Sequence, residues 1–375
     1  MAANFAAFFM TQFFSKSLCL LCLFSLVSCQ TYRIKKHDKD IISFLDETTV
    51  SDKQISKFPD FGGISGLDYL GNDTYILVAD VPSNPRLYKA EIKIAGHQIS
   101  SFEILEKIEL DIPKEHQNQV FDLESIRYDE KNDLYFVGSE GRISAENEGF
   151  VMTLNSDFEI VNLYDSLPHY SVKNSRNNGL FEGVSTDIDH KGFWFVNELP
   201  LKTDGSKPGL INSFSPIRMS YFDLEQEKIT EQYAIDLGRV SKTPLLPFMI
   251  NGVTDILQLN KNQFLFLERA FSAGHGNKGN NVRVFIIDIS KATDILKHKD
   301  LKAHKKDIQL ADKKLIFDFK SVKKKLTSKI IDNIEGISFG PVLPSGEQSL
   351  LLMSDDNFSS YSDQINQVVL LKLNL

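Results

Sequence analysis

The sequence has few cysteines and no excess of basic residues. Its 375 residues include three cysteines and one tryptophan. Cys19 and Cys22 lie in an apolar N-terminal stretch, so removal of that stretch would leave only Cys29 and no disulfide within the monomer. The net charge of −8 lacks the basic excess of DNA- and RNA-binding proteins, so we expect no nucleic-acid partner. Stability must therefore come from an apolar core.

Long hydrophobic runs are also missing. The apolar run Leu18–Val27 follows Lys16 and ends in Leu26-Val27-Ser28-Cys29, and it is too short to be assigned as a membrane-spanning helix. It is similar to a bacterial lipoprotein signal, which is cleaved before a cysteine that then carries lipid. We predict a signal peptide over residues 1–28, a lipid-anchored tether over 29–57 and a globular domain over 58–375. The alternative is an N-terminal helix or anchor that stays on the protein.

The expected location follows from this signal. Gln30 stands after Cys29, where an aspartate is associated with retention at the inner membrane. We therefore expect an exported protein, anchored through lipid on Cys29 to the outer membrane and facing the periplasm or the cell surface.

Short strand-like runs dominate the chain from Phe58 onward, and long amphipathic helices are not evident. The runs are rich in aromatic and branched residues and are separated by Gly, Asn, Asp and Pro clusters, which indicates an all-β fold. The clearest runs are Tyr75–Ala79, Leu134–Val137, Phe193–Val196, Phe264–Leu267 and Leu350–Met353.

One sequence pattern occurs five times, and each copy begins before one of these runs and contains it. Each opens with a polar or acidic residue beside an apolar one and ends in an acid after the strand. The openings fall at Ser65, Glu124, Glu182, Thr254 and Glu335. This repetition predicts a β-propeller. A four-stranded blade takes roughly 40–50 residues, so we prefer six blades and keep five as the alternative. We expect the final run, Gln367–Leu373, to pair with the N-terminal strands and close the ring.

Glutamate occupies the same repeat position in three copies, at Glu124, Glu182 and Glu335. Carboxylates that converge on one axis repel one another unless a cation or a basic side chain compensates them. Oxygen ligands of this kind favour Ca²⁺, with Mg²⁺ less suitable. We predict a divalent cation, most readily Ca²⁺, held by these three residues and Asp255. The alternative is that each glutamate accepts hydrogen bonds from backbone amides at a blade corner.

The acids that end the repeats are Asp80, Glu140, Glu198 and Asp355, and we expect them to cap turns, with use in a metal or active site as the alternative. The fourth copy differs because it ends in Glu268-Arg269 and continues into a loop containing His275. We predict that Glu268 and His275 move protons and that Arg269 and Arg142 hold phosphate. The alternative for Glu268-Arg269 is a surface loop with an ion pair. The lysine-rich segment 290–330 is expected to be a solvated insertion.

Several motifs together carry a family resemblance. They are Gly62-Gly63-Ile64-Ser65-Gly66-Leu67-Asp68, Asp122-Leu123-Glu124-Ser125-Ile126, Phe181-Glu182-Gly183-Val184, Gly252-Val253-Thr254-Asp255-Ile256, Leu267-Glu268-Arg269, Asn333-Ile334-Glu335-Gly336-Ile337 and Leu351-Leu352-Met353-Ser354-Asp355-Asp356-Asn357-Phe358. The set resembles the phytase-like family, "esterase-like activity of phytase", over nearly all of residues 58–375. The resemblance implies an exported β-propeller that hydrolyses a small phosphate ester.

The leading hypothesis is thus a monomeric, lipid-anchored phosphoesterase that uses a divalent cation. Two alternatives remain open at this stage. One is a propeller that hydrolyses lactones or carboxylic esters, and the other is a non-enzymatic binding module at the cell surface.

Overall fold

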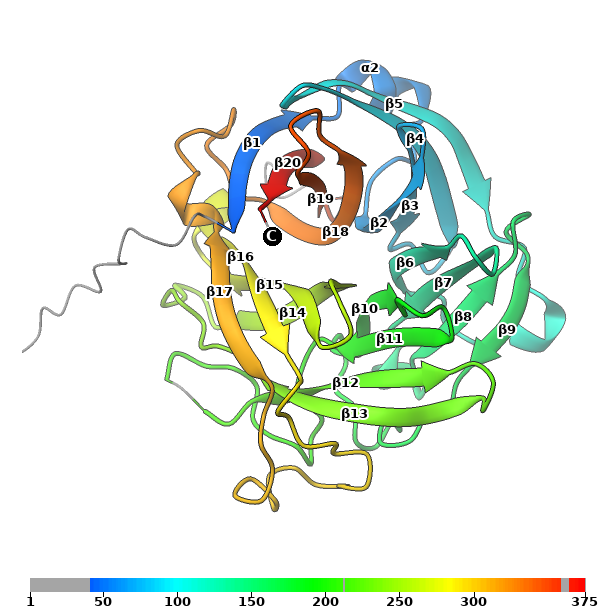
Figure 1. Cartoon of the computed structure of the whole chain (residues 1–375), viewed down its shortest axis with the longest axis vertical. Helices are drawn as coiled ribbons and strands as arrows, with labels where there is room; N and C mark the ends of the chain where they lie inside the picture. Colours follow the sequence, from blue (N-terminus) through cyan, green and yellow to red (C-terminus); the bar gives the residue numbers. More distant parts are fainter. Residues whose placement is uncertain (1–40, 212, 359–363, 375) are drawn as a thin grey trace, which may run out of the picture. The chain divides into compact units, whose positions relative to one another are not determined.

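A computed structural model describes residues 41–211, 213–358 and 364–374. In the compact unit Asp40–Leu375 these residues form five four-stranded antiparallel sheets, arranged as blades around a ring (Figure 1). The predicted all-β propeller is confirmed. Its described part has five blades, so the alternative count was right and the preferred count of six was wrong.

The blades follow one another in the sequence, and in each the strand nearest the axis is named first. The first holds β2 (Ile64–Gly71), β3 (Thr74–Ala79), β4 (Arg86–Ala95) and β5 (Gln98–Glu109). The second holds β6 (Leu123–Asp129), β7 (Leu134–Ser139), β8 (Phe150–Leu154) and β9 (Ile160–Tyr164). The third holds β10 (Phe181–Thr186), β11 (Gly192–Asn197), β12 (Pro216–Asp223) and β13 (Lys228–Asp236). The fourth holds β14 (Met249–Gln258), β15 (Gln263–Ser272), β16 (Asn280–Asp288) and β17 (Asp312–Asp318).

The fifth blade closes the ring by joining the two ends of the described chain. It holds β18 (Asn333–Val342), β19 (Gln348–Asp355), β20 (Gln367–Leu373) and, outermost, β1 (Ile42–Thr49). The pairing of β20 with β1, in which Ile42 lies opposite Leu373, confirms the predicted closure. Residues 42–57 were expected in the tether, but they form β1 and helix α2 (Asp52–Lys57). The strand β1 was hard to predict because it is the outermost strand, is mostly half-exposed and so lacks apolar alternation.

Helices are few and short. Besides α2, the described chain has the 3₁₀ turns η1 (Lys114–His116), η2 (Ile143–Ala145), η3 (Gly276–Lys278) and η4 (Phe319–Ser321). Among the described residues, no helix has the length and apolar character needed to cross a membrane. The segment around Cys29, including the predicted signal and lipid site, lies outside the described residues.

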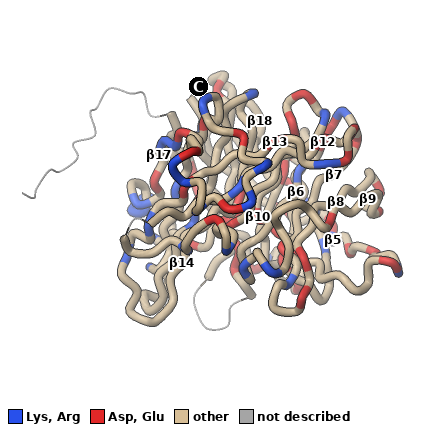
Figure 2. Tube along the Cα trace, turned by 90° about the horizontal axis from the view of Figure 1, so that it is seen from below, with Lys and Arg blue, Asp and Glu red and all other residues tan. Residues whose placement is uncertain are grey.

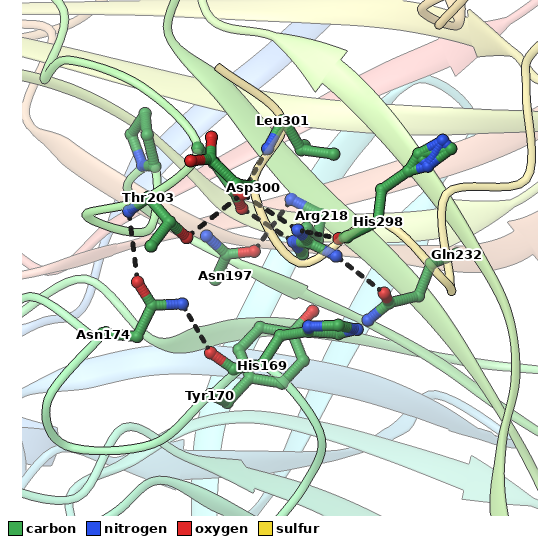
Figure 3. Close-up of polar contacts among 12 residues, drawn as sticks. His169, Tyr170, Asn174, Asn197, Thr203, Arg218, Gln232, His298, Asp300 and Leu301 are labelled. Atoms are coloured by element: carbon green, nitrogen blue, oxygen red, sulfur yellow. Dashed lines mark hydrogen bonds and ion pairs between the residues drawn. The ribbon is translucent and has the colours of Figure 1, made fainter. Parts of the chain in front are cut away.

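Long connections, rather than a sixth blade, take up the widening gaps between repeats. One of them, residues 289–311, leaves β16 and covers the outer edge of β13, where Ile295 and Ala311 donate backbone hydrogen bonds to carbonyls of β13. A buried network fastens this connection (Figure 3): Arg218 pairs with Asp204 at 2.6 Å and donates to the His298 carbonyl at 2.7 Å. The lysine-rich insertion is therefore packed on one side, although most of its lysines are exposed.

Apolar clusters fill the spaces between neighbouring blades. One cluster joins Val78 of β3 and Leu87 of β4 to Ile126 and Val137 of the next blade, and all four are fully buried. The innermost strands β2, β6, β10, β14 and β18 contact one another around the ring. Their N-terminal ends all point to the same end of the propeller, which we call the site end.

Candidate cation and phosphate site

Each innermost strand contains a β-bulge at the predicted repeat position. The pairing register with the second strand skips one residue, and the skipped residues are Ser65, Glu124, Glu182, Thr254 and Glu335. A bulge leaves its extra residue unpaired and re-aims its side chain. The five positions that the repeat made equivalent are thus equivalent in structure, at the site end of the innermost strands.

A second set of equivalent positions lies beside the bulges, at the end of each blade's second strand. The register aligns Asp80, Glu140, Glu198, Arg269 and Asp355. Four blades therefore place an acid here and the fourth blade places an arginine. Asp122 adds one more carboxylate, because it directly precedes β6 and its carbonyl accepts from the Glu140 amide at 3.0 Å.

Eight carboxylates interact in this region, and we call them the acidic cluster: Asp80, Asp122, Glu124, Glu140, Glu182, Glu198, Glu335 and Asp355. Two triplets within it offer oxygen atoms that all lie within 4.8 Å of one another. One triplet is Asp80, Asp122 and Glu124, and the other is Glu124, Glu140 and Glu182. Glu124 belongs to both, so the described residues contain two adjoining three-carboxylate groups that share one side chain.

Arg269 compensates only one side of the cluster. Its Nη2 lies 3.0 Å from Glu335 Oε1 and 3.8 Å from Glu198 Oε1. Within the described chain, neither Glu124 nor Glu182 has a lysine, arginine or histidine nitrogen within ion-pair distance. Glu124, the one side chain that both triplets share, thus has no ion-pair partner in the described chain.

The electrostatics of the cluster favour protons or cations. Burial, followed by repulsion from neighbouring carboxylates, raises the pKa of Glu124 and Glu182 well above the usual range. Burial and the Glu198 charge raise the pKa of Glu140 to about 8. Burial and a hydrogen bond shared with Asp122 raise the pKa of Asp80 to about 10. Burial also raises the pKa of Glu198, and the nearby positive charge of Arg269 partly offsets this rise. The resulting pKa is about 7.

Unsatisfied polar atoms support cation binding over simple protonation. Glu140 Oε2 and Ser65 Oγ are buried without a hydrogen-bond partner. Buried polar atoms are normally paired, so unpaired ones at a cluster of carboxylates indicate a missing ligand. Carboxylate and hydroxyl oxygens are ligands that Ca²⁺ accepts in a flexible geometry. The residues present therefore fit an oxygen-coordinated divalent cation.

Asp255, predicted as a metal ligand, lies on the axis in a different environment. Its Oδ1 accepts from Arg127 Nη2 at 2.7 Å, and its Oδ2 accepts from the Ile337 amide at 2.9 Å. Arg127 is 2 % exposed and also donates to backbone carbonyls of β2, β6, β14 and β18. The pair fills the centre of the ring, so Asp255 is fully occupied there and does not join either triplet of the acidic cluster.

Glu268 lies away from the cluster because consecutive side chains of β15 point to opposite faces of the sheet. It occupies the register position of Ala79, Ser139 and Asn197, one residue before the cluster positions. It is fully buried and pairs with Lys313 and with Arg283, the latter at 3.3 Å. Arg269 next to it faces the cluster, so the structure divides the Glu268-Arg269 pair between two sites.

His275 and Arg142 lie in loops at the site end. His275 Nε2 contacts the Thr243 carbonyl at 2.9 Å and so links two loops. Arg142 is exposed, and its backbone bridges to Asn147. Among the described residues, neither His275 nor Arg142 forms a hydrogen bond or ion pair with the acidic cluster.

The second acids combine turn capping with membership in the cluster. Asp355 accepts from the Asn357 amide at 2.6 Å and from Asn333 Nδ2 at 3.2 Å. Glu140 accepts from two backbone amides, which lowers its pKa against the larger effect of burial. Both roles predicted as alternatives for these acids, capping and site membership, thus occur together, whereas Asp122 had no predicted role. The recurrence of the second acids at the end of the apolar strand that follows each bulge was the signal that could have placed them in one ring.

The sequence matches one protein family over residues 59–358, most of its length. That family is Phytase-like, described as esterase-like activity of phytase. The chain belongs to this family. The membership predicted from the repeat motifs is thereby confirmed, and it agrees with a propeller of hydrolase type. No curated protein is similar enough to match the chain.

Solved structures with a similar arrangement are distant. One is a Kuenenia stuttgartiensis hydrazine synthase, with 10% identity, 81% of each chain covered and a TM-score of 0.37. Another is an exo-beta-1,3-galactanase from Clostridium thermocellum, with 9% identity, 89% of this chain and 63% of that chain covered, and a TM-score of 0.45. A third is an endo-1,4-beta-xylanase from Bacteroides thetaiotaomicron, with 10% identity, 82% and 90% covered, and a TM-score of 0.43. At these scores the likenesses carry no argument about chemistry.

Proposed function

We propose that this phytase-like propeller is a phosphoesterase that depends on a divalent cation, most readily Ca²⁺. The observation that carries the proposal is the pair of three-carboxylate groups sharing Glu124, next to the partly exposed Arg269 at the same end of the ring. Carboxylates select the cation, and a guanidinium suits a phosphate anion. Family membership supports the hydrolase class.

The acidic cluster would hold the cation through Glu124, Glu140 and Glu182, with a second position at Asp80, Asp122 and Glu124. A bound divalent cation polarises a phosphoryl oxygen and lowers the pKa of a coordinated water. The chain itself supplies the negative charge that makes binding favourable, because the glutamates of this cluster are buried without full compensation. Cation binding replaces the protons that burial otherwise favours.

Arg269 is the residue best placed to hold substrate phosphate. Its side chain is 15% exposed and its Nη2 is shared between Glu335 and Glu198, so part of its donor set remains available to an anion. Glu198 lies beside it, with a pKa of about 7, which suits proton transfer near neutral pH. This assigns to Glu198 the proton-transfer role that the sequence had suggested for Glu268.

The test is phosphate release from phytate and from aryl phosphates by the purified protein, with added Ca²⁺ or with chelator. We expect release only with the cation, and a loss of at least about 100-fold in Glu182→Gln and Arg269→Ala. Glu225→Gln removes an exposed carboxylate in the turn at the opposite end, and we expect it to keep full activity. Inactivity of the wild type with every divalent cation would refute the proposal. Turnover of lactones or carboxylic esters that is unaffected by Arg269→Ala would favour the alternative hydrolase.

We also propose that the protein is an outer-membrane lipoprotein anchored through Cys29, as the N-terminal pattern predicts. Labelled fatty acid should be incorporated into the wild type and should be absent from Cys29→Ser. Fractionation of the two membranes would then identify the location. Equal labelling of both proteins would contradict the lipid site.

A further inference from the structure

An exposed apolar loop projects from the site end of the propeller. Eleven large hydrophobic side chains are exposed among the described residues, and five of them lie on two loops, 198–215 and 237–248. They are Leu210, Ile211, Leu245, Leu246 and Phe248, with exposed fractions of 37%, 83%, 69%, 59% and 55%. Four of these residues are more than half exposed, which is unusual for leucine, isoleucine and phenylalanine gathered in one place. We call them the apolar tip.

The apolar tip is held in place rather than hanging free. The Val240 amide donates to the Gly209 carbonyl at 2.8 Å, which joins the two loops. The Leu245 amide donates to the Ala273 carbonyl at 2.8 Å, which joins them to the loop before η3. Pro244 and Pro247 flank the two leucines and restrict the backbone there. These hydrophobic side chains are therefore presented outward on a braced loop.

Lysines border the apolar tip on the neighbouring loops. Lys242 donates to the Lys278 carbonyl, and Lys320 donates to Ser241 Oγ at 3.2 Å. Burial, together with the charges of Lys323, Lys320 and Lys278, lowers the pKa of Lys242, so these three lysines lie near Lys242. Basic residues also mark the trace beside β17 (Figure 2). We call Lys242, Lys278, Lys320 and Lys323 the basic border.

We propose that the apolar tip and the basic border form a surface that binds an anionic lipid bilayer. Apolar side chains next to lysines match the two parts of such a surface, the acyl boundary and the anionic head groups. A soluble anionic partner would account for the lysines but not for the exposed hydrophobic side chains of the apolar tip. This surface goes beyond the proposed catalytic function and does not depend on it.

The location of this surface has a consequence for orientation. The apolar tip and basic border belong to the third and fourth blades, whereas the acidic cluster lies around the axis at the same end. Anionic lipid attracts the border and repels unneutralised carboxylates. The protein would therefore contact the bilayer by one side of its site end, with the acidic cluster opening toward the membrane without touching it.

The test uses fluorescence from the loop itself, so that lipid on Cys29 cannot mimic the result. The full chain has one tryptophan, Trp194, which is 4% exposed and gives a constant background. In Phe248→Trp, we expect a blue shift when vesicles of phosphatidylcholine with phosphatidylglycerol are added, and quenching by brominated acyl chains. The matched control is Val342→Trp, at a residue 65% exposed at the opposite end of β18, and it should not shift.

A second comparison tests the charges in the Phe248→Trp background. Replacing Lys278, Lys320 and Lys323 by glutamate should raise the lipid concentration for half of the shift at least tenfold. The same change at Lys131, Lys228 and Lys291, exposed at the opposite end, should leave it within about twofold. No shift with vesicles, or an equal shift in Val342→Trp, would overturn the proposal. A blue shift that depends on protein concentration without lipid would overturn it too, because it would identify a second copy as the occupant.

Discussion

At the residue scale, the fourth blade departs from the other four at a single equivalent position. Asp80, Glu140, Glu198 and Asp355 lie at the ends of the second strands of their blades, and Arg269 takes the equivalent position in β15, which continues to Ser272. One guanidinium thus faces eight carboxylates. The arginine in the fourth blade gives this ring of acids one positively charged side. A site that binds both a cation and a phosphate ester needs negative and positive charge side by side.

The Arg269→Gln variant separates the two roles of the site. Removing the positive charge relieves competition for the carboxylates, so Ca²⁺ affinity should stay the same or rise. Phosphate release should fall by at least about 100-fold if Arg269 holds the phosphate. Calcium titration and phosphate release on one preparation measure both effects. Loss of calcium binding together with activity would instead assign Arg269 a structural role.

The Arg127–Asp255 pair is expected to act on stability alone. Arg127→Met leaves Asp255 buried without its partner and removes donors from carbonyls of four innermost strands. Breaking such a buried pair costs about 3–5 kcal/mol of unfolding free energy. Arg142→Met, at an exposed arginine, should stay within about 0.5 kcal/mol of the wild type. Urea unfolding compares the two, and equal stability would show that the axial pair contributes little.

Individual residues were predicted unevenly from the sequence. The structure brings Glu124, Glu182, Glu335 and Arg269 into one region; the repeat makes the three glutamates equivalent, and Arg269 belongs to the second set of equivalent positions. Glu268 was placed with Arg269 because the two are adjacent in sequence, yet adjacent residues on a strand face opposite sides. Only the pairing register, which a sequence does not display, shows which of the two faces the acids.

At the element scale, the bulges account for the glycines that follow the repeat position. Gly66, Gly183 and Gly336 come directly after bulged residues, where neighbouring innermost strands approach closely. A Cβ at Gly183 would lie 3.1 Å from the Asp255 Cα and 2.9 Å from Val196 Cγ1. The glycines are therefore needed for strand packing near the axis rather than for binding.

Gly183→Ala tests this packing. The backbone atoms of β14 near Gly183 cannot easily move aside, so we expect a loss of about 1–3 kcal/mol in unfolding free energy. Gly209→Ala is the matched control, since nothing lies within 4 Å of the added Cβ. Chemical unfolding curves should show the control unchanged within about 0.5 kcal/mol. A neutral Gly183→Ala would mean that the innermost strands separate readily.

The positions of the strands explain why the sequence suggested six blades although the described chain has five. The apolar second strands of the blades were recognised from their composition, and so was β20. The third and fourth gaps between repeats suggested an extra blade, but they hold the loops 198–215 and 237–248 and the packed connection 289–311. Chain length alone cannot separate a blade from a long connection that covers a strand edge.

At the scale of the whole molecule, the acidic cluster should make stability depend on pH and on cation. Burial raises the pKa of Glu140 to about 8 and that of Glu198 to about 7, from a usual value of 4.5. Between about pH 4.5 and about pH 8, these two glutamates therefore bind more protons in the folded state than in the unfolded state. Stability without cation must therefore be highest near or below the usual carboxyl pKa and fall as the pH rises to about 8.

A divalent cation should reverse this trend because it replaces the lost protons. We expect Ca²⁺ to raise the melting temperature little at about pH 5 and by several degrees at about pH 8, since a ligand at 100 times its Kd stabilises by about 2.7 kcal/mol. Thermal unfolding with chelator and with Ca²⁺ at both pH values measures the difference. An equal effect of Ca²⁺ at both pH values would indicate binding outside the buried carboxylates.

The central claim is that the acidic cluster binds divalent cations through Glu124, and calorimetric titration tests it most directly. Ca²⁺ is added to chelator-stripped protein near pH 8, using wild type, Glu124→Gln and the control Glu225→Gln. We predict saturable binding with proton release in the wild type and the control, and binding at least about tenfold weaker in Glu124→Gln, because this residue belongs to both triplets. Absence of binding in the wild type, or equal affinity in Glu124→Gln, would contradict the account.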